Sequence, residues 1–321
     1  ERNRYTGTHH QASKLTLKTM SRFTGAGGAK AERLEESVRN GDAYGALQTY
    51  KTFYARAKKK GDWNAAIDLL RSGSTVLLEE NDLTGGTELA LLLAETLEEG
   101  AIQQDDEVKA LILSVSAAFE SVKGEKERLA EAAKNQARFL KACIDWSTLK
   151  KFGQFAKGDP EFHLLRAKAM IRMGNLAGAS ANFLHAGKPQ EFAQFLFQWS
   201  SAGYQKERDL FLARAVLQLL ALENLKDANE LYATFMVLLQ KNNQELPGTP
   251  LANFTRYLLR TVEREAYPLF QMLCQKYAAS INRDQTFQQY LDRIQEHFFG
   301  VKAQKRGMQA MMDNMLGMFN R

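Results

Sequence analysis

The sequence has few of the residues that build disulfide frameworks, and it lacks the long apolar runs of membrane spans. Its 321 residues include two cysteines and five prolines. Cys143 and Cys274 lie far apart, each in a helical pattern, which predicts neither a disulfide framework nor a metal motif. The longest apolar stretches are too short or too charged to cross the roughly 30 Å bilayer core. Because a secretory signal pattern is also lacking, we expect a cytosolic protein without direct membrane insertion.

Signatures of catalysis and of cofactor binding are also missing. The TGAGGAK segment departs from a phosphate-binding loop, because Ala29 precedes Lys30 and Ala31 takes the place of the hydroxyl residue. The five histidines form no metal-ligand pattern, and neither cysteine has a catalytic signature. We therefore expect no enzyme activity, no metal and no cofactor.

Apolar residues recur with a helical period from about residue 29 onward, and alternating strand patterns are absent. A short pattern recurs at Gly41, Gly61, Gly174 and Glu223, where Asp or Asn follows and Ala comes four residues later. Glycine ends one helix, Asp or Asn caps the next, and alanine permits close helix packing. This predicts an all-α fold, a right-handed α-solenoid of stacked, tetratricopeptide-like helical hairpins.

The expected organisation is a flexible leader over 1–28, an N-terminal solenoid half over 29–150 and a C-terminal half over 151–321. The segment KNNQELPGTP, 241–250, predicts a loop because it holds two prolines and a glycine. The expected helices span 30–40, 42–60, 62–80, 87–99, 105–121, 125–145, 160–173, 175–186, 189–202, 206–221, 224–241, 250–263, 265–279, 284–298 and 304–318.

Charge is polarised along the N-terminal half. Residues 1–30 carry six Lys or Arg and one Glu, whereas 72–108 carry ten Asp or Glu and no Lys or Arg. In the helix over 42–60, one face is apolar, and the opposite face holds Tyr44, Gln48, Lys51 and Lys59 with Arg56 at its flank. Such a face is either simply solvated or a docking surface on which tyrosine supplies contact area and cations attract an acidic partner.

The C-terminal region carries two apolar stripes. In the helix over 284–298 the stripe runs from Phe287 to Val301 and includes Phe298, which we expect in the core. Phe299 lies off this stripe and needs another cover, either the tail or a bound polypeptide. Five of the ten methionines recur in that tail at helical spacing, which favours core packing or a surface for another polypeptide.

Three segments together carry a family resemblance: DAYGALQTYKTFYARAKKKGDWNAAIDLLRSGSTVLL, GDPEFHLLRAKAMIRMGNLAGASANFLHAG and QQYLDRIQEHFFGV. In order and placement, over roughly 30–320, they resemble the Golgi to ER traffic protein 4 family. These are α-solenoid adaptors of the guided-entry pathway for tail-anchored membrane proteins. The resemblance implies an N-terminal site for the pathway's targeting ATPase. It also implies a C-terminal site for a ubiquitin-like-domain protein that recruits a tetratricopeptide co-chaperone.

The resemblance also implies site residues. The ATPase-binding residues would be Tyr44, Lys51, Arg56, Lys59 and Glu88, with Glu88 modulating nucleotide hydrolysis by the ATPase. The residues that bind the ubiquitin-like partner would be Phe254, Tyr257, Phe298, Phe299, Val301, Met308, Met311 and Met315.

An alternative function is that of a helical-repeat nucleic-acid-binding protein, which the sequence pI of about 9.1 and the basic leader favour. Two features speak against it. The basic residues are not interleaved with aromatics along successive hairpins, and the acidic segment 72–108 would repel phosphate.

Overall fold

The computed structural model describes residues 28–204, 207–244 and 248–302, with an all-helical chain over these ranges apart from an isolated bridge between Thr148 and Phe155. The predicted all-α solenoid is confirmed. The chain forms two compact units, residues 1–186 and 187–321. The expected helix over 304–318 and residues 1–27 of the expected leader over 1–28 lie outside the described residues, while Gly28 begins helix α2.

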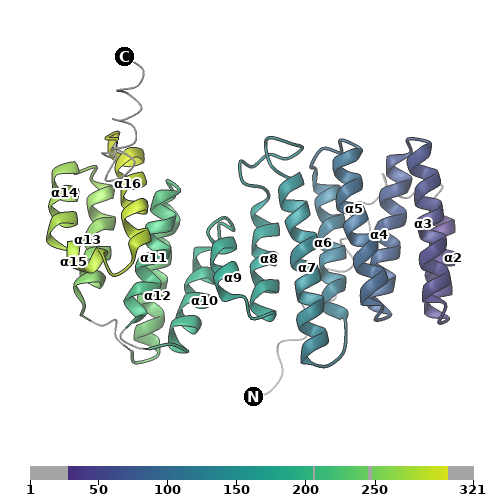
Figure 1. Cartoon of the computed structure of the whole chain (residues 1–321), viewed down its shortest axis with the longest axis horizontal. Helices are drawn as coiled ribbons and strands as arrows, with labels where there is room; N and C mark the ends of the chain where they lie inside the picture. The colour runs from purple at the N-terminus through teal and green to yellow at the C-terminus, as the bar shows by residue number, and fades with distance from the viewer. Residues whose placement is uncertain (1–27, 205–206, 245–247, 303–321) are drawn as a thin grey trace, which may run out of the picture. The chain divides into compact units, whose positions relative to one another are not determined.

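In the first unit, each helix packs against the next one or the second next, as expected for stacked helical hairpins, and Figure 1 shows successive helices side by side. Thus α4 contacts α2, α3, α5 and α6, and α7 contacts α5, α6 and α8. The helices are α2 (Gly28–Arg39), α3 (Ala43–Lys59), α4 (Trp63–Glu79), α5 (Leu83–Glu99), α6 (Asp106–Ser121), α7 (Lys126–Trp146), α8 (Pro160–Arg172) and α9 (Leu176–Phe183).

The first three hairpin turns follow a period of twenty residues. Asp42, Asp62 and Asp82 each accept a hydrogen bond from the backbone N–H three residues later, at 2.9 to 3.1 Å. The residue before each cap has a positive φ: 98° at Gly41, 72° at Gly61 and 67° at Asn81. Asparagine tolerates this conformation better than most residues, so the turn forms without glycine. Helix α5 therefore begins at Leu83, four residues before the expected start at 87.

A buried polar network attaches α2 to the stack. The Tyr50 hydroxyl is 3.1 Å from the Ser72 hydroxyl, which donates to Glu35 Oε1 at 2.6 Å. Tyr50 is fully buried, and this burial raises its pKa to about 12. Because burial without partners costs these groups free energy, the network ties α2, α3 and α4 together.

The segment between α7 and α8 belongs to the first unit, which ends at Ala186 and not at the expected residue 150. Asp159, with 1% of its surface exposed, accepts hydrogen bonds from Gln104 at 2.6 Å and from Lys109 at 3.2 Å. Its own backbone N–H donates to the Ser147 hydroxyl at 2.9 Å. Because these contacts reach α6 and the loop before it, residues 147–186 continue the same stack.

The second unit packs α12 against α10 and α11, and α11 against α13 and α16. The helix expected over 265–279 is two helices, which meet at Tyr277. The helices are α10 (Pro189–Ser201), α11 (Arg208–Ala221), α12 (Leu225–Lys241), α13 (Pro250–Glu263), α14 (Tyr267–Lys276), α15 (Ala278–Ile281) and α16 (Gln285–Phe299).

Candidate docking surfaces

The first candidate surface is the outward face of α3. Tyr44 has 76% of its surface exposed, and Arg56 and Lys59 are also exposed. The opposite side of the helix buries Ala46, Leu47 and Tyr50, so packing fixes which side faces outward. The Arg56 guanidinium lies 6.0 Å from the centre of the Phe53 ring. This places the predicted Tyr44, Lys51, Arg56 and Lys59 on one helix, with Arg56 at the flank as expected.

Helix α5 lies beside α3 and presents acidic side chains to it. Lys51 Nζ is 2.5 Å from Glu88 Oε1, so the structure brings together two residues that the sequence places 37 positions apart. A second ion pair joins Lys58 to Glu99, and hydrogen bonding to Glu99 raises the pKa of Lys58. Residue numbers rise together from the first pair to the second, so α3 and α5 run in the same direction. We call α3 and α5 with these pairs the charged face.

Lys58 was missed by the sequence analysis, although its spacing carries a signal. Lys51 and Lys58 are seven residues apart, which places them on one side of α3, and Glu88 and Glu99 are similarly aligned on α5. Exposed pairs of this kind contribute about 0 to 1 kcal/mol each, so a partner can open them at little cost. Among the described residues, Arg56 and Lys59 form no ion pair. These two cations are therefore available to an acidic partner.

The second candidate surface lies on α13, α14 and α16, but it excludes one predicted residue. Phe254 is fully buried and its ring lies 5.8 Å from that of Tyr277, so we assign Phe254 to the core rather than to a partner-binding surface. Its position on the core side of α13, with Leu251 and Leu258, explains this. Tyr257 has 39% of its surface exposed, beneath the Arg256 guanidinium at 4.9 Å.

The end of α16 shows how Phe299 is covered. Its ring lies 5.5 Å from Tyr267 and 5.1 Å from Phe270, both on α14, so helix α14 provides a cover that sequence reasoning did not foresee. Phe298, expected in the core, is half-buried, as are Phe299 and Val301. The predicted Met308, Met311 and Met315 lie outside the described residues.

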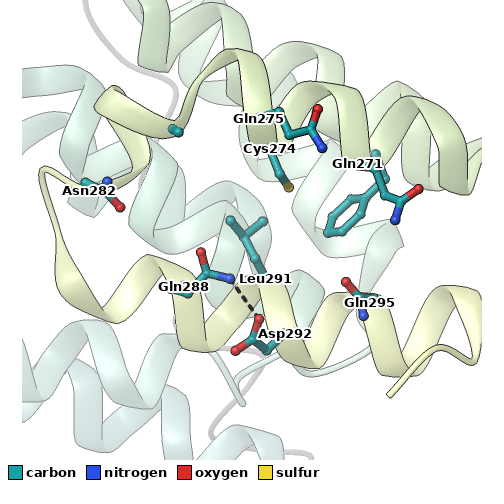
Figure 2. Close-up of a pocket in the computed structure, with 10 residues that line it drawn as sticks. Gln271, Cys274, Gln275, Asn282, Gln288, Leu291, Asp292 and Gln295 are labelled. Carbon is teal, nitrogen blue, oxygen red and sulfur yellow. Dashed lines mark hydrogen bonds between the residues drawn. The ribbon is translucent and has the colours of Figure 1, made fainter. Parts of the chain in front are cut away.

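A groove of about 380 Å³ separates α14 from α16. Figure 2 shows Gln271, Cys274 and Gln275 on one side, facing Gln288, Leu291, Asp292 and Gln295 on the other. Phe270 and Leu291 are buried beneath it, and the rim is mostly carboxamide. Carboxamides both donate and accept hydrogen bonds, so the rim can pair with polar groups of a bound polypeptide while Phe270 and Leu291 contact its apolar side chains. We call it the α14–α16 groove.

Two exposed apolar residues of α14, Leu269 with 45% and Met272 with 58% of their surface exposed, also escaped the sequence analysis. The signal was present, because YPLFQMLCQK is apolar on more than one side of the helix. A helix with exposed apolar residues beside its buried side is typical of an interaction surface.

The described residues offer no group of three or more His, Cys, Asp or Glu side chains that could hold a metal ion. Within the same ranges, no helix is both long and apolar enough to span a bilayer. His297 lies at the end of α16 with its Nδ1 atom 2.7 Å from Glu223 Oε1, a contact that links two helix ends.

Comparisons with known proteins agree on one family. The family model for Golgi to ER traffic protein 4 matches residues 60–319. The Golgi to ER traffic protein 4 homolog of Dictyostelium discoideum is 34% identical, over 89% of this chain and 88% of the relative. The Homo sapiens homolog is 30% identical, over 84% of this chain and 79% of the relative.

The same family is found among solved structures. The crystal structure of C. therm. Get4 matches with a TM-score of 0.75 and 28% identity, covering 88% of this chain and 93% of that one. Sequence and fold therefore lead to the same conclusion: the chain belongs to the Golgi to ER traffic protein 4 family.

Proposed function

We propose that this chain is a non-enzymatic adaptor of the guided-entry pathway, acting in the cytosol. It binds the targeting ATPase through the charged face and the ubiquitin-like-domain protein through the second unit. The ubiquitin-like protein recruits the tetratricopeptide co-chaperone, and tail-anchored clients pass from the co-chaperone to the ATPase. The supporting observation is that the two units carry surfaces of contrasting chemistry, ion pairs on α3 and α5 and a carboxamide-rimmed groove over the apolar Phe270 and Leu291 on α14 and α16.

The charged face supports the ATPase site because it combines an exposed aromatic anchor with cations. Tyr44 supplies apolar area, and Arg56 and Lys59 attract acidic groups. Lys51 Nζ lies 2.5 Å from the Glu88 carboxylate, and a partner that binds Lys51 would release the Glu88 carboxylate from this ion pair. This exchange gives Glu88 a route to modulate nucleotide hydrolysis.

Titration of the ATPase against Arg56→Glu/Lys59→Glu tests the site. We expect affinity to fall at least tenfold at about 0.1 M salt, and wild-type binding to weaken further as salt screens the charges. Lys123→Glu/Lys134→Glu is the matched control, since it changes the charge equally at exposed lysines outside α3. Equal loss in both variants, or salt-independent wild-type binding, would contradict a specific charged docking surface.

The ubiquitin-like partner is assigned to Tyr257, Phe298, Phe299 and Val301, with Leu269 and Met272 as additions from the structure. Leu269→Glu/Met272→Glu should abolish copurification with the partner's N-terminal segment, whereas Glu263→Gln/Arg264→Gln, on the neighbouring helix end, should not. Unchanged copurification in the first variant would remove α14 from this site.

The nucleic-acid alternative loses support at the charged face, because Lys51 and Lys58 are neutralised by Glu88 and Glu99. A gel shift at physiological salt is expected to show no complex. A complex that weakens steeply with salt would restore that alternative.

A further inference from the structure

The chain leaves α16 in a defined direction. Gly300 ends the helix with φ +66°, a left-handed conformation that turns the backbone away from the helix axis. Gln295 then donates a hydrogen bond from Nε2 to the Val301 carbonyl at 3.1 Å, with the Lys302 carbonyl at 3.5 Å. Gln295 also lines the α14–α16 groove (Figure 2), so the next residues begin at the groove's edge.

The groove combines an apolar floor with a polar rim, which suits an amphipathic helix. Beneath it lie the buried side chains of Phe270 and Leu291, and around it stand Gln271, Gln275 and Gln288. Asp292 adds a carboxylate on the same side as Gln295, where a cation from an incoming segment would be favoured. Along α14 the lining runs from Phe270 to Gln275, about 7.5 Å at 1.5 Å per residue, and it continues onto Ala278 of α15.

The sequence that follows matches these features. Met308, Met311, Met312, Met315 and Met318 recur at helical spacing, and a helix over this stretch would present them along about 15 Å. The unbranched thioether adapts to irregular grooves. The preceding run KAQKR, 302–306, carries three cations, which the carboxylates of Asp292 and the exposed Glu296 would attract.

We infer that residues 303–321 occupy the α14–α16 groove as an intramolecular ligand while no partner is bound. The ubiquitin-like protein must displace this segment to bind there. The inference that residues 303–321 bind in the groove is drawn from the groove and the sequence. Only their displacement by the ubiquitin-like protein rests on the proposed function. The methionines predicted above as partner contacts would then compete with the partner.

Cys274 provides a built-in probe of the occupancy, because its half-exposed thiol lines the groove. Cys143 is buried, and this burial raises the pKa of its thiol, so Cys143 should stay unlabelled while the protein is folded. In the full-length chain we expect N-ethylmaleimide to label Cys274 about tenfold more slowly than in Met308→Glu/Met311→Glu/Met315→Glu, a ratio that corresponds to about 1.4 kcal/mol of docking free energy.

The matched control is Gln309→Glu/Ala310→Glu/Asn320→Glu, which adds the same charge off the methionine stripe and should keep wild-type protection. The inference would be overturned if N-ethylmaleimide labelled Cys274 equally fast in wild type and the methionine variant. It would also be overturned if Cys274 lost its protection from labelling equally in the methionine variant and the control. Labelling of Cys143 in a variant would reveal unfolding of that variant. In that case crosslinking gives a separate readout: Cys274 should form a disulfide with the new cysteine in Met311→Cys but not in Ala310→Cys.

Partner affinity separates this inference from the proposed function. The methionine variant should bind the ubiquitin-like protein several-fold more tightly if the segment competes. Weaker binding by a folded methionine variant would overturn displacement and assign these residues to the partner. If Cys274 is protected but the partner does not bind at all, the proposed function fails and the occupancy stands.

Discussion

Among the described glycines, Gly153 has the least room for a side chain. A Cβ atom added there would lie 1.7 Å from the Ser147 carbonyl oxygen, so the loop between α7 and α8 would have to move. Gly153→Ala should lower the free energy of unfolding by roughly 1 to 3 kcal/mol, measured by urea denaturation. Gly248→Ala is the control, because nothing lies within 4 Å of its added Cβ, and the same loss in both variants would contradict the steric explanation.

His185 makes stability depend on pH. Burial, followed by the neighbouring His163 and Lys157, lowers its pKa from 6.5 to about 4. Between these values the unfolded chain binds a proton that the folded chain does not, so the free energy of unfolding falls as pH drops from about 6.5 to 4. We expect a contribution of about 1 to 2 kcal/mol, less than the full shift would give because His185 is only half-buried.

Other groups also titrate in this pH range, so the effect of His185 is measured as the difference between wild type and His185→Asn. Burial would raise the pKa of Asp284, but hydrogen bonds from Thr286 and Arg214 outweigh it and lower that pKa. Protonation of Asp284 in acid therefore lowers the stability of both wild type and variant. Urea unfolding at pH 7.5, 5.5 and 4.5 should show a shallower decline in the variant. Parallel curves would exclude His185 as the cause.

At the scale of elements, α2 depends on a few buried contacts with α3 and α4. Ser72→Ala removes the hydroxyl that joins Tyr50 to Glu35, which leaves the buried Tyr50 and the half-buried Glu35 without that partner. We expect faster amide exchange throughout residues 28–39, corresponding to about 1 to 2 kcal/mol of local stability, with little change in α7. Thr52→Ala, an exposed change on α3, should leave α2 as in wild type. Uniform acceleration over the whole first unit would show that α2 does not open separately.

Helices and their caps were largely predictable, because both depend on neighbours in sequence. Asp42 and Asp62 were recognised as caps after glycine, and α3 and α4 begin within a residue of the expected positions. The third turn escaped because Asn81 takes the place of glycine. The break at Tyr277 also escaped, since apolar residues continue across it without glycine or proline.

Contacts between elements were predictable only in part. The outward face of α3 followed from its helical period, but the pairing of Lys51 with Glu88 depends on how α5 stacks beside α3. Phe254 shows the opposite failure: the family resemblance implied a contact with the ubiquitin-like partner, whereas its position on α13 places it in the core. Helical spacing alone does not show which stripe a neighbouring helix will cover.

At the scale of the whole molecule, the two units divide the chain at Ala186 rather than at the expected residue 150. The expected boundary at 150 falls within the loop at 147–159, yet Asp159 and Ser147 bind this loop into the first unit. The helical pattern of a repeat stack continues across the boundary between the two units. The position of that boundary therefore depends on contacts between residues far apart in sequence, which the local pattern does not show.

The central claim is that one chain bridges two different proteins through separate surfaces. Immobilised targeting ATPase, incubated with the ubiquitin-like protein, should retain it only when this chain is added. Arg56→Glu/Lys59→Glu should abolish retention while leaving binding to the ubiquitin-like protein intact. Leu269→Glu/Met272→Glu should abolish retention while leaving ATPase binding intact. Retention without the chain, or displacement of one protein by the other, would contradict the bridging function.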